Sequence, residues 1–139
     1  MVTPKLEQGR WFGPVYEAIV ASAEESLGVA LPEQYRDFLL RYGSGLVGSY
    51  EIYGLGGPPN RVPSLLWLIE DLQRSGLHRP KSVIPFHAEG DGDYSAVLAE
   101  PLCGQPAGAV VYWSPRQDDV LDVKPAYASL NDWFAERAQ

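Results

Sequence analysis

The residues best suited to chemistry lie in one short acidic turn, Glu89-Gly90-Asp91-Gly92-Asp93. Carboxylates two residues apart, with glycines between them, could hold a hard cation through oxygen ligands. The turn lacks the further Asp or Asn ligands and the terminal Glu of a calcium-binding loop, so a hairpin turn with solvated charges is the favoured interpretation. In that setting Glu89, Asp91 and Asp93 could face basic groups on a protein partner.

Two further features could serve the same partner. A second acidic pair, Asp118-Asp119, lies two strand connections further along the chain. Turns two apart in an antiparallel meander lie at the same end of the sheet, so we expect both acidic turns at one edge. Trp67 lies off the apolar stripe of its predicted helix, and a partly exposed Trp is a common interface anchor. Packing of Trp67 against the sheet or against Pro58-Pro59 is the alternative.

Other residues of the types found in active sites lack the required spacing. Cys103 with His78 or His87 would offer a thiol nucleophile and a base, but no family signature surrounds the cysteine. The same three residues do not have the spacing of a zinc site. The glycine-rich residues 54–57 lead into two prolines rather than into a helix, and proline removes the N–H groups that bind phosphate. We therefore expect no catalytic residue, cofactor or metal ligand.

The most clearly encoded structural feature is a corner between two helices, with the sequence LGVALPEQYRDFLLRY over residues 27–42. Gly28 can adopt the left-handed conformation that ends a helix. Pro32 suits the first turn of the next helix, where its missing N–H costs no hydrogen bond. The apolar face of that second helix recurs at i, i+3, i+4 and i+7 and consists of Tyr35, Phe38, Leu39 and Tyr42.

Two more helices flank this corner in the sequence. The first is predicted from about residue 13 to residue 27, and its apolar side consists of Val15, Ile19, Ala23 and Leu27. A short strand at residues 49–53 follows the corner. A third helix then begins after Ser64, a good N-cap, and ends near residue 75.

The second half of the chain is rich in β-branched and aromatic residues between turns. Strands are predicted at residues 82–86, 93–99, 108–113 and 119–123. Ser129 caps a final helix whose buried face consists of Leu130, Trp133 and Phe134. This order predicts an α+β fold with N-terminal helices, a mainly antiparallel sheet of about five or six strands and a C-terminal helix.

The length and composition indicate one domain in a reducing compartment. We expect residues 1–139 to form a single domain, with residues 1–12 as a loose N-terminal arm of which only Trp11 and Phe12 dock. The chain has one cysteine, so no intrachain disulfide can form, and a cytoplasmic location is natural. Its N-terminus does not resemble a secretory signal, and no apolar run is long enough to span a membrane.

The charge of the chain bears on its partners. The formal net charge is −7, which opposes nonspecific nucleic-acid binding because that binding is driven by Lys and Arg. A negative surface favours a basic protein partner, since opposite potentials speed encounter. The alternative is that the charge only keeps the protein soluble.

Several segments together resemble one known family. The ordered set in the corner consists of Leu27, Gly28, Leu31, Pro32, Glu33, Tyr35, Phe38, Leu39, Gly43 and Gly45. These residues resemble the SUKH superfamily. Further along, the segment VIPFHAEGDGDYSAVL is similar to the strand, Gly-Asp turn and strand of that superfamily, and the segment YASLNDWF is similar to its terminal segment. That superfamily includes bacterial toxin-immunity proteins and fungal regulators of cell-wall assembly. Its members usually have Asn before the paired glycines, where this chain has Tyr42.

The resemblance implies helices packed against a mainly antiparallel sheet, and binding rather than catalysis. It implies an immunity protein that binds and neutralises a co-encoded bacterial toxin, such as a nuclease, without a cofactor. The partner-facing residues predicted from the sequence are Glu89, Asp91, Asp93, Asp118, Asp119 and Trp67. Two alternatives stay open: a regulatory or scaffold interaction module of the same fold, and a small metal-dependent hydrolase that uses the Asp91 and Asp93 turn.

Overall fold

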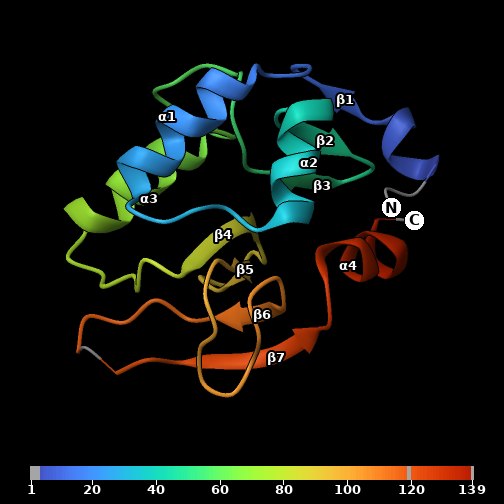
Figure 1. Cartoon of the computed structure of the whole chain (residues 1–139). Helices are drawn as coiled ribbons and strands as arrows, with labels where there is room; N and C mark the ends of the chain where they lie inside the picture. The colour runs from blue at the N-terminus through green and yellow to red at the C-terminus, as the bar shows by residue number, and fades with distance from the viewer. Residues whose placement is uncertain (1–3, 119, 139) are drawn as a thin grey trace.

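The computed structural model describes residues 4–118 and 120–138 and shows an α+β fold with a C-terminal helix, as predicted (Figure 1). The helices in these ranges are the 3₁₀ helix η1 (Pro4–Gln8), α1 (Glu17–Leu27), α2 (Glu33–Arg41), α3 (Leu65–Arg74) and α4 (Leu130–Arg137). The strands are β1 (Arg10–Trp11), β2 (Gly45–Val47), β3 (Tyr50–Ile52), β4 (Val83–Ala88), β5 (Tyr94–Leu98), β6 (Val110–Trp113) and β7 (Val123–Tyr127).

These strands form two antiparallel sheets rather than one. One sheet has the order β1-β2-β3 and the other has the order β4-β5-β6-β7. They adjoin where β3 meets β4, because the Tyr53 N–H donates to the Phe86 carbonyl at 2.7 Å. Beside that bond, His87 Nδ1 lies 2.8 Å from the Glu51 carbonyl oxygen. A carbonyl can only accept, so Nδ1 of His87 carries the proton and joins the two sheets.

The corner between α1 and α2 is built as the sequence predicts. Gly28 has φ of 75°, in the left-handed region, and its N–H donates to the Glu24 carbonyl at 2.9 Å. The Glu24 carboxylate then accepts the Leu31 N–H at 2.7 Å, which fixes the entry into α2. The apolar face of α2 is buried at Tyr35, Phe38 and Leu39.

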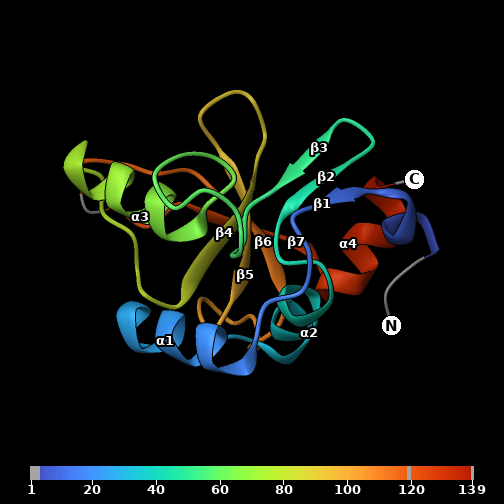
Figure 2. The ribbon, with the colours of Figure 1, turned by 90° about the horizontal axis from the view of Figure 1, so that it is seen from above.

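The core closes when α4 packs against α2 and β4. Ser129 caps α4 by accepting the Asp132 N–H at 3.1 Å, as predicted. The Phe134 ring stacks on Phe38 with centroids 5.6 Å apart, and Trp133 meets Phe86 edge-on at 5.0 Å. Figure 2 shows α1 and α2 on one side of the sheets and the β2–β3 and β4–β5 hairpins projecting on the other. In the described ranges, no helix combines the length and apolar character needed to cross a membrane.

The first helix and the N-terminal arm differ from the expectation. Helix α1 begins at Glu17, four residues later than predicted, and its buried face includes Val20, while Ile19 is 47% exposed. The arm is not loose over its described part. Leu6 is fully buried there, and β1 pairs with β2.

The last predicted strand is wrong by four residues. Residues 119–123 were expected to be extended, but the strand β7 is Val123–Tyr127 and contains Pro125. The Asp118 carboxylate accepts the Val120 N–H at 3.2 Å, which holds a turn in place of the strand start. Proline is tolerated in β7 because this strand lies at the edge of its sheet, where one row of N–H groups has no partner strand.

Candidate functional site

The acidic turn connects β4 to β5 and is closed by its own backbone. The Glu89 N–H donates to the Asp93 carbonyl at 2.9 Å. Inside the turn the Asp91 carboxylate accepts the Asp93 N–H at 3.1 Å, which is an Asx-type turn. The Asp91 side chain is exposed, so its charge faces solvent.

The two acidic turns lie at the same end of the sheet, as the meander topology predicts. The link is direct, because the Ser114 hydroxyl at the end of β6 donates to the Asp93 carboxylate at 2.7 Å. Asp118 follows in the β6–β7 turn and accepts from Arg116 at 3.1 and 3.0 Å. The hydrogen bonds from Arg116 and from the Val120 N–H hold the pKa of Asp118 at about 2. Asp119 lies outside the described residues.

Glu89 has a different environment from the other predicted acids. Its carboxylate receives Arg137 at 2.9 Å and the Ser95 hydroxyl, and only 17% of its side chain is exposed. Burial tends to raise the pKa of Glu89, but the hydrogen bonds from Arg137 and Ser95 outweigh it and lower that pKa. The charge of Glu89 is therefore met inside the molecule rather than presented to solvent.

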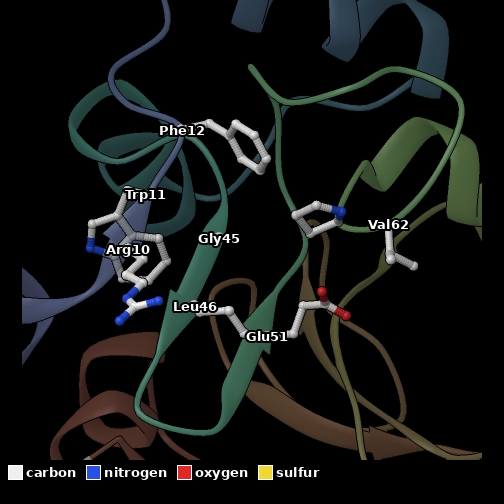
Figure 3. A pocket seen from close by; sticks show the side chains of 8 residues that line it. Arg10, Trp11, Phe12, Gly45, Leu46, Glu51 and Val62 are labelled. Carbon is white, nitrogen blue, oxygen red and sulfur yellow. The ribbon is translucent and has the colours of Figure 1, made fainter.

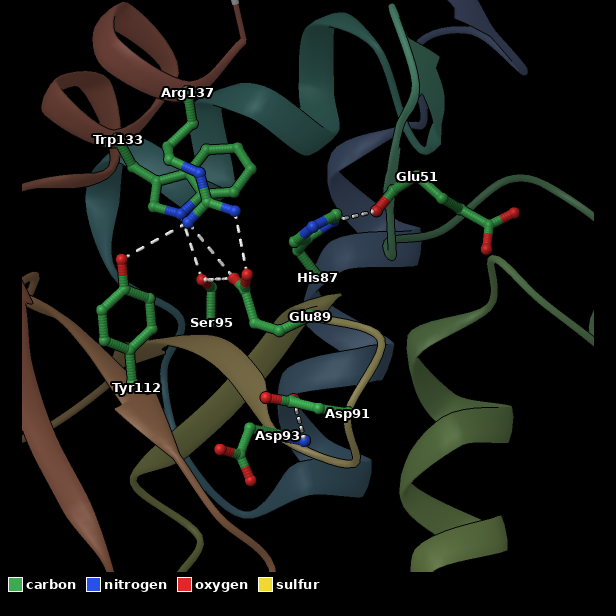
Figure 4. Close-up of polar contacts among 9 residues, drawn as sticks. All are labelled: Glu51, His87, Glu89, Asp91, Asp93, Ser95, Tyr112, Trp133 and Arg137. Carbon is green, nitrogen blue, oxygen red and sulfur yellow. Dashed lines mark hydrogen bonds and ion pairs between the residues drawn. The ribbon is translucent and has the colours of Figure 1, made fainter.

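Glu89 belongs to a set of paired polar groups that joins α4 to β5 and β6 (Figure 4). Arg137 lies over the Trp133 ring at 5.2 Å from the centroid, and Trp133 Nε1 donates to the Ser95 hydroxyl at 3.1 Å. Arg137 also lies 3.4 Å from the Tyr112 hydroxyl. We call this set, Glu89, Ser95, Tyr112, Trp133 and Arg137, the Arg137 cluster. Because the polar groups of the Arg137 cluster bind one another, the cluster has a structural role.

Two other predicted features are found in ordinary settings. The Trp67 side chain is half-buried and packs against the core, as the alternative interpretation allowed. The backbone N–H of Trp67 donates to the Ser64 hydroxyl, which caps α3, at 3.2 Å. Cys103 is exposed in a turn, with φ of 51°. Within the described ranges, no group of three His, Cys, Asp or Glu side chains is arranged to hold a metal ion.

A groove that the sequence did not reveal lies over the β1-β2-β3 sheet (Figure 3). It has a volume of about 400 Å³, and its lining residues are Arg10, Trp11, Phe12, Gly45, Leu46, Glu51, Val62 and Pro63. These residues come from three segments of the chain: β1 with the residue after it, the β2–β3 hairpin, and the loop before α3. The only signal in the sequence was the adjacent aromatic pair Trp11-Phe12, and the topology was needed to bring the other two segments beside it.

The carboxylates of Glu51, in the groove lining, and of Asp71 on α3 both act on Tyr53. Burial, together with the negative charges of Glu51 and Asp71, raises the pKa of Tyr53 to about 12. Burial and Asp71 also raise the pKa of Tyr94, which follows the acidic turn directly. Carboxylates from β3 and α3 thus share one side of the molecule with the β4–β5 turn.

The helices and the two antiparallel sheets form an α+β domain that carries an exposed apolar groove and acidic turns. The sequence model of the SUKH_5 family, described as SMI1-KNR4 cell-wall, matches residues 6–139. The chain therefore belongs to the SUKH superfamily, as the sequence resemblance predicted, and this membership supports a protein-interaction role. Among curated proteins, no match to the chain is found.

Proposed function

We propose that the protein is an immunity protein that binds a co-encoded bacterial toxin in the cytoplasm and neutralises it. The observation that carries the proposal is the family match over residues 6–139 in a chain of net charge −7. An acidic binding domain is suited to a toxin domain with a basic active cleft, such as a nuclease. The mechanism is occlusion of that cleft, with no catalytic step, cofactor, nucleic acid or membrane.

The acidic turns supply the electrostatic part of this function. Asp91 contributes most, because it is exposed and has no ion pair within the described ranges. The partner of Asp93 is a neutral hydroxyl, whereas Arg116 beside Asp118 offsets much of that carboxylate's field. Asp119 follows Asp118 directly in the sequence and joins the proposal. Glu89 adds little, since its charge is neutralised by Arg137 at 2.9 Å.

Trp67 is proposed as an anchor at the side of this surface. Its ring is half-buried on α3, so a partner that covers the remaining exposed part gains apolar contact without ordering a flexible side chain. On the same helix, one turn further, lies Asp71, which links Trp67 to the acidic side of the molecule.

A growth assay tests the proposed function. The C-terminal domain encoded by the neighbouring gene is expressed in a susceptible bacterium, with this chain or with an unrelated acidic protein of similar size. We expect growth only with this chain, and a 1:1 complex when the chain is purified with an inactivated form of that domain. Growth arrest despite expression of this chain would contradict neutralisation.

A regulatory interaction module is the second candidate, and the cell-wall description of the matching family favours it. Such a module would have no toxin gene beside it and would bind a host protein. Inspection of the gene neighbourhood separates the two, because immunity requires an adjacent gene for a large secreted protein with a variable C-terminal domain.

A further inference from the structure

The groove over the β1-β2-β3 sheet gathers exposed apolar side chains. Seven large apolar side chains are exposed in the described ranges, and three of them line this groove. They are Phe12, Leu46 and Val62, with 55%, 40% and 39% exposure. Apolar surface of this kind, bordered by charged groups, is typical of protein-interaction sites. Burying this apolar surface against a partner removes it from water, which favours association.

The walls of the groove are held in place by the fold. On one side, the Phe12 N–H donates to the Ser44 carbonyl at 2.9 Å, and Trp11 Nε1 donates to the Leu6 carbonyl at 2.6 Å. Across the floor, a Cβ on Gly45 would lie 2.2 Å from the Arg10 carbonyl oxygen, so only glycine allows β1 to approach β2 this closely. A preformed groove pays little ordering entropy on binding.

Two charged side chains border the apolar part, and neither has a partner among the described residues. Arg10 is exposed and Glu51 is half-exposed, and within residues 4–118 and 120–138 neither side chain has an ion pair or hydrogen bond. Figure 3 shows them on opposite sides of Leu46, and Figure 4 shows the Glu51 carboxylate pointing away from the Glu89–Arg137 pair. A bound segment would therefore meet a cation at one end and an anion at the other.

We propose that this groove docks a segment of the partner protein in which an aliphatic or aromatic side chain is followed closely by Lys or Arg. The apolar side chain packs among Phe12, Leu46 and Pro63, and the basic side chain pairs with Glu51. Charge complementarity selects this occupant, because Glu51 lies on the side where Asp71 adds further negative charge. The Arg10 guanidinium then donates a hydrogen bond to a carbonyl or carboxylate oxygen of the segment.

This assignment rests on the protein-binding role proposed above and names the chemistry of what is bound. It differs from the acidic-turn proposal in its location and in its dependence on salt. Contacts in the groove are apolar and short-range, so they act on dissociation, whereas exposed carboxylates act mainly on the rate of encounter.

A displayed library of random 12-residue peptides tests the assignment. The library is selected on the full-length chain and counter-selected on a Leu46→Asp variant, which places a carboxylate in the apolar part of the groove. We expect enriched peptides that share an apolar residue within two positions of Lys or Arg. A synthetic peptide of that sequence should bind the wild type and lose at least tenfold in affinity with Leu46→Asp and with Glu51→Lys.

Matched controls separate groove chemistry from charge and folding. Glu100→Lys makes the same charge change on an exposed residue after the far end of β5, and it should bind the peptide like the wild type. Circular dichroism and thermal unfolding check that each variant is folded. The assignment is overturned by the absence of any shared enriched sequence, or by a consensus peptide that Leu46→Asp and Glu51→Lys bind as tightly as the wild type.

The same variants distinguish this assignment from the proposed function. If the inactivated toxin domain binds wild type and Leu46→Asp equally, the groove assignment falls and neutralisation stands. If that domain fails to bind the wild type while the consensus peptide binds at the groove, neutralisation falls and the groove assignment stands.

Discussion

The Arg137 cluster and the groove both contain an Arg and a Glu, yet the two regions use them in opposite ways. In the cluster, Arg137 and Glu89 lie 2.9 Å apart, with 20% and 17% of their side chains exposed. In the groove, Arg10 and Glu51 lie on opposite sides of exposed apolar side chains and make no ion pair with a described residue. Paired polar groups hold the fold together, whereas unpaired groups around an apolar surface are available to a partner.

The largest expected effect is on the cluster side of this comparison. Trp133→Ala removes a fully buried indole that contacts Phe86 and Phe134, so we expect the free energy of unfolding to fall by about 3–5 kcal/mol. Urea unfolding measures it. Trp67→Ala is the matched control and should cost less, because Trp67 is only half-buried. Equal losses for the two variants would contradict the structural role given to the cluster.

Breaking the ion pair should have the next largest effect. Arg137→Met keeps an apolar stem over Trp133 but leaves the Glu89 carboxylate without its cation, and we expect a loss of about 2–3 kcal/mol in the free energy of unfolding. Arg74→Met breaks two exposed pairs on α3 and should change the same quantity by less than about 1 kcal/mol. A loss for Arg137→Met no greater than that of the control would show that the pair is not structural.

The pH dependence of stability sharpens the same contrast. The folded-state pKa of Glu89 lies below its ordinary value of 4.5, so its stabilising contribution is complete above the unfolded pKa and is lost as pH falls through the folded pKa. Between pH 6 and pH 3 the wild type should therefore lose more stability than Glu89→Gln. Chemical unfolding at several pH values gives both slopes. Parallel slopes would indicate that Glu89 has the same pKa folded and unfolded.

Substitution in the groove should leave stability almost unchanged. Leu46 is 40% exposed, so Leu46→Asp should alter the free energy of unfolding by about 0.5 kcal/mol or less. A loss comparable to that of Arg137→Met would show that Leu46 supports the fold, and the contrast between the two regions would break down.

The smallest effect is expected at the acidic turn. Asp91→Asn removes one exposed charge and can keep the Asx-type bond to the Asp93 N–H through its amide oxygen. Association with a basic partner should slow modestly and depend less on salt, with little change in dissociation. Stopped-flow association at two ionic strengths measures this, and Glu100→Asn is the control. If the association rates of wild type and Asp91→Asn depend identically on salt, Asp91 does not steer the partner.

Local rules predicted the elements whose signals lie within a few residues. The Gly28 helix end and the Ser64 and Ser129 caps were identified because each depends on a single turn of chain. The shared end of the two acidic turns followed from the alternation of antiparallel strands and is confirmed by the Ser114–Asp93 bond.

The contacts that distinguish the structural Arg137 cluster from the groove could not be predicted from short stretches of sequence. Glu89 and Arg137 are separated by 48 positions, so nothing in the turn itself indicated that its first carboxylate is paired. The groove lining was hidden for the same reason, since residues 10–12, 45–51 and 62–63 meet only after β1 pairs with β2. Strand β2 itself is three residues long and contains Gly45, which weakens the pattern by which strands are recognised.

Titration calorimetry of the chain with an inactivated form of the neighbouring toxin domain tests the central claim most directly. The wild type, Glu51→Lys and the charge-matched control Glu100→Lys are measured side by side. We expect a 1:1 complex for the wild type and Glu100→Lys, and at least a tenfold weaker complex for Glu51→Lys. Equal affinities for all three proteins would contradict docking through the groove, and the absence of binding by the wild type would contradict the immunity function.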